Sequence, residues 1–344
     1  MPVNDGTESS KETPEDTGDT EKAVEEEATA ATSAVKVEPS TEVFADPNEP
    51  LGEIVVDDID AVELDLNYQR IGEIKKGELE KLKCLENLYL RWNLIKKIEN
   101  LESLVNLTEL ELYGNQITKI EGLETLVNLE NLDLSFNRIT EINGIHTLVN
   151  LRKLFLSSNK ISQIQNLGHL KKLQLLELGN NKIRVIENLE GLDSLESLFL
   201  GKNKISKINN LGHLSNLKLL SIQCNRLVKI ENLDNLTELQ ELYLSENGIE
   251  VIEGLENNKF LDTLDLATNR ISAIDNLSHL AQLQELWLNK NKISDWACVQ
   301  KLNVNKSLST IYLEANPVAK DPNYRRKIKL VVPWIKQIDA TLAK

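Results

Sequence analysis

The sequence has few of the side chains that carry out enzyme and redox chemistry. Its 344 residues include 3 cysteines, 4 histidines and 1 methionine. The cysteines Cys84, Cys224 and Cys298 are odd in number, far apart in the chain and never in a C-x-x-C pair. This usage disfavours disulfides and zinc sites and is typical of free thiols in a reducing compartment.

Long apolar runs and positive charge are also missing. No stretch approaches 18 consecutive apolar residues, and the opening residues lack a basic segment followed by an apolar one, so we expect neither a membrane span nor a secretory leader. A net charge of -15 repels phosphate backbones, so nucleic acid is not an expected partner. These absences together favour a protein of the nucleus and cytoplasm with no membrane partner.

The negative charge is concentrated at the N-terminus. Residues 1–50 hold 14 Asp and Glu against 3 Lys, an excess of 11, which leaves about -4 for the other 294 residues. Such a segment buries too little apolar area to offset its ordering entropy. We expect 1–50 to be a disordered acidic tail that acts as a solvated spacer.

From residue 61 onward the sequence repeats with the unit L-x-x-L-x-L-x-x-N-x-I-x-x-I-x-x-L-x-x-L. Its asparagine recurs every 22 residues from Asn93 to Asn291; a degenerate first unit has Gln69 in its place and a last one ends at Asn316, which makes twelve units. This period and pattern match the leucine-rich repeat. The sequence therefore predicts an α/β right-handed solenoid over residues 61–316.

Each conserved position of the unit has a physical role. Alternation with a period of two sends Leu154 and Leu156 inward from a short strand, and Lys153 and Phe155 outward onto the concave face of a parallel sheet. The repeated asparagine can satisfy backbone groups at the turn that follows. With 22 residues per coil, the convex side has room only for short helical or 3₁₀ segments.

The ends of the array need caps, because a terminal repeat would otherwise expose its core. Residues 51–60 are expected to form the N-terminal cap and 317–344 a helical C-terminal cap. Asp321 is a candidate N-cap with Pro322 at the first helical position, and Pro333 should end or kink the helix. Trp334 and Tyr324 are expected to cover the last repeat rather than to form a ligand site.

The sequence offers no catalytic or metal-binding constellation. Three of the histidines, His169, His213 and His279, lie ten residues after a repeat asparagine, on the convex side and two to three coils apart, where they cannot converge. No phosphate-binding, dinucleotide-binding, zinc-protease or nucleophile-elbow motif occurs. We expect no enzyme activity, no cofactor and no metal.

The concave face holds the distinctive information. The residue four positions before each repeat asparagine forms a column of six aromatic residues, five acidic residues and one serine, although the whole chain has only 15 aromatics. The column is Asp65, Tyr89, Glu111, Asp133, Phe155, Glu177, Phe199, Ser221, Tyr243, Asp265, Trp287 and Tyr312. Strand propensity alone would explain some of the aromatics, but not their alternation with carboxylates.

A second column, six positions before the asparagine, adds apolar and charged groups beside the first. It includes Glu63, Glu109, Lys153, Leu175, Leu219, Glu241 and Glu285, of which Leu175 and Leu219 extend an apolar strip. With strands ~4.8 Å apart, the column from Asp65 to Tyr312 runs about 50 Å. That length suits a folded protein partner with a basic patch, because the carboxylates would steer its approach.

The repeat phase, the aromatic and acidic column and the ending from Asn316-Pro317 to Asp339 resemble one family, the regulatory subunit 7 family of protein phosphatase 1. The resemblance covers about residues 45–344 and includes the segments Leu286-Trp287-Leu288-Asn289 and Asn269-Arg270-Ile271. It implies that the concave face binds the phosphatase catalytic subunit. The residues it implies are Asp133, Phe155, Glu177, Phe199, Glu285, Trp287 and Tyr312, with Tyr89, Glu111, Leu175, Leu219, Tyr243 and Asp265 as additional candidates.

The function predicted from sequence is thus that of a non-catalytic regulatory subunit that controls the activity, maturation or location of the phosphatase. We expect a monomer when alone, with a further phosphatase inhibitor subunit as a possible third component. Two other classes stay open at this stage. One is a spliceosomal scaffold that pairs with an RNA-binding protein, and the other is a cytoskeletal or chaperone-type repeat protein.

Overall fold

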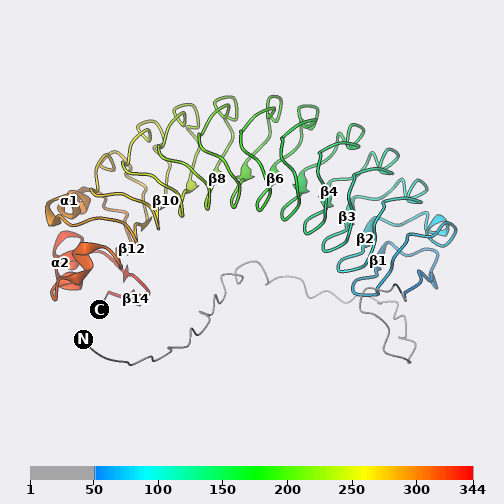
Figure 1. Cartoon of the computed structure of the whole chain (residues 1–344), viewed down its shortest axis with the longest axis horizontal. Helices are drawn as coiled ribbons and strands as arrows, with labels where there is room; N and C mark the ends of the chain where they lie inside the picture. The colour runs from blue at the N-terminus through cyan, green and yellow to red at the C-terminus, as the bar shows by residue number, and fades with distance from the viewer. Residues whose placement is uncertain (1–49, 51, 344) are drawn as a thin grey trace, which may run out of the picture. The chain divides into compact units, whose positions relative to one another are not determined.

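The computed structural model describes residue 50 and residues 52–343. Of the predicted acidic tail of residues 1–50, residues 1–49 lie outside the described residues. In the repeat region one three-residue strand per unit pairs in parallel with the next, and Figure 1 shows these strands along the inner side of a row of coils. The strands of the twelve units are β1 Glu63–Asp65, β2 Asn87–Tyr89, β3 Glu109–Glu111, β4 Asn131–Asp133, β5 Lys153–Phe155, β6 Leu175–Glu177, β7 Ser197–Phe199, β8 Leu219–Ser221, β9 Glu241–Tyr243, β10 Thr263–Asp265, β11 Glu285–Trp287 and β12 Thr310–Tyr312.

The core is a continuous stack of leucine and isoleucine layers inside the coils. The middle residue of each strand and the second residue after it are fully buried, as Leu154 and Leu156 show. Each such side chain contributes ~1.5–3 kcal/mol by leaving water. Because one coil cannot enclose its own apolar face, this stabilisation exists only in the stack.

The repeat asparagine joins each coil to the one before it, as the sequence predicts. The Asn159 side-chain oxygen accepts the Ile139 N–H at 2.9 Å, while its Nδ2 donates to the Leu134 carbonyl at 2.9 Å and the Leu156 carbonyl at 3.1 Å. Equivalent bonds recur at every repeat asparagine from Asn93 to Asn316. The ladder asparagines therefore set the register between coils.

A second recurring position holds the chain in the left-handed backbone region. Seven residues after each ladder asparagine from Asn93 to Asn269 stands Asn or Gly, with φ between 56° and 70°, for example Asn188 at 56° and Gly144 at 67°. Only these residue types adopt that region at low cost. Where it is Asn, its Nδ2 donates to a carbonyl one coil back, as Asn188 does to Ile164 at 2.8 Å.

The convex side contains less helix than the short helical or 3₁₀ segments that the sequence predicts for each coil. In most coils it consists of single i→i+3 turns, such as Leu104 N–H to the Leu101 carbonyl at 3.0 Å. Named helical segments occur only near the two ends of the described region. They are η1 Leu79–Lys81, α1 Trp296–Gln300, η2 Lys301–Val304, η3 Pro317–Lys320 and α2 Tyr324–Val331.

The C-terminal segment covers the last repeat with both helix and sheet. Helix α2 begins at Tyr324, so the predicted start near Asp321 is too early; Asp321 instead accepts the Asn323 N–H at 2.8 Å and pairs with Lys327 at 2.5 Å. The helix ends at Val331, before Pro333. The sequence prediction also missed two strands, β13 Gln337–Ile338, parallel to β12, and β14 Thr341–Leu342, antiparallel to β13.

Candidate functional site: the concave face

The predicted column occupies the last residue of each of the strands β1 to β12, so its twelve side chains lie in register on one face of the sheet. Phe155 pairs with Glu177 across β5 and β6, and Glu177 pairs with Phe199 across β6 and β7. At the C-terminal end, Trp287 pairs with Tyr312, and their ring centroids are 5.5 Å apart. The structure thus brings the predicted residues together on a single surface.

The exposure of the column is uneven. The aromatic members, Asp133 and Glu177 are half-buried, and Asp65 is exposed. Glu285, Leu175 and Leu219 of the second column are also half-buried. Three members are buried: Glu111 is 8% exposed, Ser221 5% and Asp265 3%. The expectation that every column side chain stands exposed is therefore wrong at these three positions.

The acidic members bend back onto their own turn. Carboxylate oxygens of Asp133 and Glu177 accept the backbone N–H two residues further on, each at 2.8 Å, and Asp265 does the same at 2.9 Å. Aspartate and glutamate reach this N–H because their side chains are short and flexible, whereas an aromatic ring projects away from the strand. The carboxylates consequently stabilise the turn that leads to the ladder asparagine as well as facing the concave side.

Burial makes several of these carboxylates poorly solvated acids. It raises the pKa of Glu177 to about 7, a shift that its bond from the Gly179 N–H reduces and the negative charge of Asp133 increases. Burial also raises the pKa values of Asp133, Asp265 and Glu111, and at Glu111 the ion pair with Arg91 opposes the shift. A cation brought to this surface would stabilise their charged forms.

Two aromatic members of the column, Tyr243 and Trp287, carry hydrogen-bond donors, and of these two only Tyr243 has an acceptor among the described residues. The Tyr243 hydroxyl donates to Glu241 at 2.6 Å, and burial followed by this carboxylate raises the tyrosine pKa. The Trp287 Nε1–H is buried and has no hydrogen-bond acceptor among the described residues. A buried donor without an acceptor costs about 1–3 kcal/mol, so this indole is better satisfied when another molecule supplies one. Tyr89 resembles Tyr243, since burial and then Glu109 raise its pKa to about 12.

The concave face has a shallow hollow where β3, β4 and β5 meet. It measures about 310 Å³ and is lined by Arg91, Glu109, Glu111, Asp133 and Phe155, among others. Acidic groups outnumber the cations there, which fits the basic partner surface predicted from the sequence.

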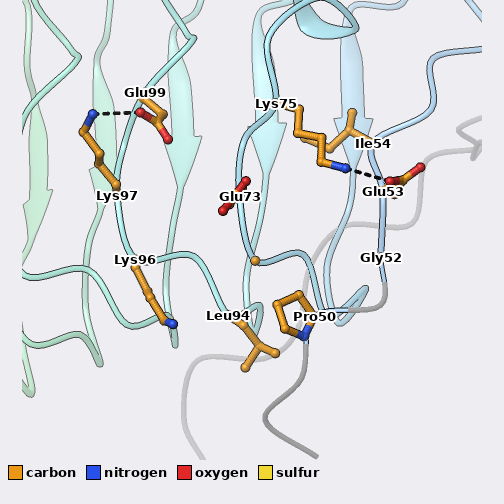
Figure 2. Close-up of a pocket in the computed structure, with 11 residues that line it drawn as sticks. Pro50, Gly52, Glu53, Ile54, Glu73, Lys75, Leu94, Lys96, Lys97 and Glu99 are labelled. Atoms are coloured by element: carbon orange, nitrogen blue, oxygen red, sulfur yellow. Dashed lines mark hydrogen bonds and ion pairs between the residues drawn. The ribbon is translucent and has the colours of Figure 1, made fainter. Parts of the chain in front are cut away.

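A larger cleft lies at the N-terminal end but has paired charges. It measures about 520 Å³, and Figure 2 shows Lys75 bonded to Glu53 and Lys97 bonded to Glu99, each at 2.7 Å. These four side chains are exposed, so the pairs are weak and solvated.

Metal and membrane features are absent from the described part of the chain. Over residues 52–343 no three His, Cys, Asp or Glu side chains are placed to hold a metal ion. Within the same range no helix combines the length and the apolar character needed to cross a bilayer. Two histidines bond instead to backbone carbonyls one coil back, His169 to Ile145 at 3.0 Å and His279 to Leu255 at 2.8 Å.

Sequence reasoning missed an exposed aromatic cluster beside the ladder turns of the first coils. Tyr68, Trp92 and Phe136 each directly precede a ladder position and are 69%, 46% and 40% exposed. Trp92 lies 5.3 Å from Tyr113 and 6.3 Å from Phe136 between ring centroids, and Tyr113 lies 4.7 Å from Phe136. These four residues are called the edge cluster below. The recurrence of aromatics just before the ladder position could have identified it.

The comparisons with known proteins agree with this architecture. A family model described as leucine-rich repeats in two copies matches residues 85–125, 105–145, 127–169, 149–194 and 171–213, and a second, described as a leucine-rich repeat, matches 234–343. The chain belongs to the leucine-rich-repeat proteins. An internalin from Listeria monocytogenes superposes with a TM-score of 0.67 at 25% identity over 81% of this chain and 87% of its own. A leucine-rich-repeat protein of Leptospira interrogans also gives 0.67, at 26% identity over 80% of this chain and 77% of its own.

Curated relatives support the narrower resemblance. Proteins named protein phosphatase 1 regulatory subunit 7 are 53% identical over 49 residues in Danio rerio and 52% identical over 52 residues in Homo sapiens. The one from Xenopus tropicalis is 50% identical over 52 residues. The resemblance predicted from the sequence is confirmed by these names. The match covers 14% of the length of the first two relatives and 14% and 15% of this chain.

Proposed function

We propose that this leucine-rich-repeat protein is a non-catalytic regulatory subunit of protein phosphatase 1 that binds the catalytic subunit through its concave face. In this role it controls the activity, maturation or location of the phosphatase. The name shared by the curated relatives supports the choice of partner. The solenoid fold, whose repeats present one extended face, supports a scaffold rather than an enzyme.

One observation carries the proposal: half-buried aromatic side chains on some strands pair directly with poorly solvated carboxylates on the neighbouring strands. Phe155, Glu177 and Phe199 follow one another on adjacent strands, so apolar and acidic groups meet the partner at the same place. Aromatic side chains are the usual energetic anchors of interfaces. The carboxylates between them would select a partner with a matching basic patch.

The remaining members fit one continuous contact. Glu285 and Trp287 lie on β11 and Tyr312 lies on β12. At ~4.8 Å per strand, Tyr312 is about 24 Å along the sheet from Phe199. Asp133 on β4 begins the contact at the other end. A folded domain can span this distance. We infer that the protein is monomeric when alone and acts in the nucleus and cytoplasm. We also infer that it forms a complex with the phosphatase and a further inhibitor subunit.

The decisive experiment removes two anchors together. A variant with Phe199→Ala and Trp287→Ala should bind purified phosphatase catalytic subunit at least about a hundredfold more weakly by calorimetry, since each anchor contributes about 2 kcal/mol or more. Circular dichroism should be unchanged, because both rings lie on the concave face and not in the leucine core.

A matched control truncates two exposed apolar residues elsewhere. Val185 and Val251 are 50% and 52% exposed, and a variant with Val185→Ala and Val251→Ala should bind as the parent does. Equal affinity of the aromatic variant and this control would exclude the concave face as the binding surface. Assay of a phosphopeptide with increasing amounts of the chain would then show whether binding changes phosphatase activity.

A further inference from the structure

A row of cations runs along the flank of the solenoid, outside the concave face. The residue directly after the ladder asparagine is basic in seven of the eight consecutive coils from β4 to β11, with Gly248 as the exception. These residues, called the flank row, are Arg138, Lys160, Lys182, Lys204, Arg226, Arg270 and Lys292. Lys204 is half-buried and the other six are exposed.

Backbone hydrogen bonds fix the flank row in register. The N–H of Lys160 donates to the Ile139 carbonyl of the preceding coil at 2.8 Å, and the N–H of Lys182 donates to Ile161 at the same distance. The other members make the same bond, also at 2.8 Å. At ~4.8 Å per coil, the row from Arg138 to Lys292 therefore extends over about 34 Å.

The cations of the flank row form no ion pair among the described residues, whereas Lys97, Lys218 and Lys301 elsewhere on the surface are paired. Like charges on adjacent strands repel one another. The whole chain has a net charge of -15, but the flank row is a locally positive surface of regularly spaced cations without ion pairs. Such a surface is suited to an anionic ligand.

The edge cluster adjoins one end of this row. Phe136 and Arg138 flank the same ladder asparagine, Asn137, so the first cation of the row is two residues from the edge cluster. Phe136, Trp92 and Tyr68 hold these positions with φ of 54°, 53° and 61°, a left-handed backbone that disfavours large side chains. The residue before the ladder position has a positive φ in every coil, as at Lys202 and Glu246, so the repeat imposes this backbone, and it is the exposure of the rings that suits them to an apolar contact.

We propose that the flank row and the edge cluster together bind an acidic segment of a partner polypeptide that carries a large apolar side chain at one end. The apolar end packs on Trp92 and Phe136, and the acidic part extends along the cations toward Lys292. This surface is separate from the concave face and goes beyond the proposed phosphatase contact. An extended segment of roughly ten residues covers the row at ~3.3 Å per residue.

Charge favours a polypeptide over a nucleic acid in this role. The neighbouring concave column presents Asp133 and Glu177, and the whole chain is acidic, so a phosphate backbone would meet repulsion on one side. An extended peptide of alternating Glu and Ser carries about one charge per 6.6 Å, against one per ~1.7 Å of duplex DNA, so it meets less of this repulsion.

The test measures binding of two fluorescein-labelled peptides to the full chain by anisotropy at low salt. Both are roughly twelve residues of alternating Glu and Ser, long enough to span the row; one of them ends in a Trp-Leu-Phe extension. We expect the extended peptide to bind more tightly. A variant with Arg138→Glu, Lys160→Glu and Lys182→Glu should weaken binding of both peptides at least about tenfold. Trp92→Ser should weaken only the extended one.

A control variant with the same change in net charge reverses three exposed lysines outside the row. Lys119→Glu, Lys207→Glu and Lys259→Glu together should leave peptide affinity within about twofold of the parent. Equal losses in the two triple variants would overturn the proposal, as would tighter binding of single-stranded RNA than of either peptide. If circular dichroism shows that the triple row variant misfolds, the pair Lys160→Gln and Lys182→Gln serves instead. The concave variant with Phe199→Ala and Trp287→Ala should bind both peptides normally, which separates this surface from the phosphatase contact.

Discussion

The rings of Trp287 and Tyr312 lie side by side on β11 and β12, with centroids 5.5 Å apart and planes inclined by 58°. The pair is anchored on the C-terminal cap, because the Tyr312 hydroxyl accepts a hydrogen bond from Gln337 Nε2 at 2.7 Å. The cap therefore orients one end of the concave face. The tryptophan N–H next to it has no acceptor among the described residues, which leads to the first prediction.

Trp287→Phe should weaken phosphatase binding while leaving the free solenoid as stable as before or slightly more stable. The substitution keeps an aromatic surface beside Tyr312 but removes a buried donor that lacks an acceptor in the free chain. If the partner supplies that acceptor, its loss costs about 1–2 kcal/mol, or roughly tenfold in affinity. Calorimetry and urea unfolding together measure the two effects, and a destabilised fold with normal affinity would contradict the prediction.

Glu177→Gln should stabilise the free solenoid at pH 8, by an amount of the order of 2 kcal/mol. The glutamate pKa is raised to about 7 in the folded chain, chiefly by burial, from an ordinary value of 4.5. Its protonated form is thus favoured by folding. The contribution of this protonated side chain to the free energy of unfolding is fully present below about pH 4.5 and is lost as pH rises through 7. Urea unfolding of both proteins between pH 5 and 8 should show the difference shrinking as pH falls, and a constant difference would refute this origin.

Affinity for the phosphatase should have the opposite pH dependence. A basic group of the partner placed near Glu177 stabilises its charged form, so binding releases a proton wherever the free side chain is protonated. Affinity should then fall as pH is lowered below 7, by up to about tenfold per pH unit. In the Glu177→Gln variant the affinity should depend less on pH, and an unchanged slope in that variant would assign the effect to other groups.

Asn188 tests the left-handed position of the repeat. Its φ is 56°, and its Nδ2 donates to the Ile164 carbonyl at 2.8 Å. Both Asn188→Gly and Asn188→Ala remove this bond, at about 1 kcal/mol. Alanine should cost a further ~1 kcal/mol because its Cβ disfavours positive φ, whereas glycine avoids that strain. Chemical unfolding should show the parent as the most stable protein, the glycine variant as the next and the alanine variant as the least stable. An alanine variant more stable than the glycine variant would contradict the assignment.

The repeat phase made most of the fold predictable. A 22-residue period fixes which residues share a column, so Leu154 inward and Phe155 outward followed directly from alternation along the strand. The bonds of the ladder asparagines were also predictable, since the turn leaves backbone groups that an amide can satisfy.

The conformations of individual side chains were less predictable. The pattern gives the direction of the Asp265 Cβ, but not the bend of its carboxylate onto the Ala267 N–H that leaves it 3% exposed. The strands β13 and β14 were missed because residues after Asn316 leave the repeat frame, and two-residue strands carry no periodic signal. That the implied residues form the phosphatase contact stays a prediction.

The antiparallel pairing of β14 with β13 limits growth of the sheet. Each strand from β1 to β12 pairs in parallel with the strand that follows it. A parallel strand left unpaired at the end of the sheet would have an open edge that could accept a coil from another molecule. At the last step the chain reverses, and Arg325 further engages the Thr341 and Leu342 carbonyls at 3.3 Å and 2.8 Å. The edge that remains is two residues long and partly occupied. A short edge of this kind disfavours the addition of a further strand at β14.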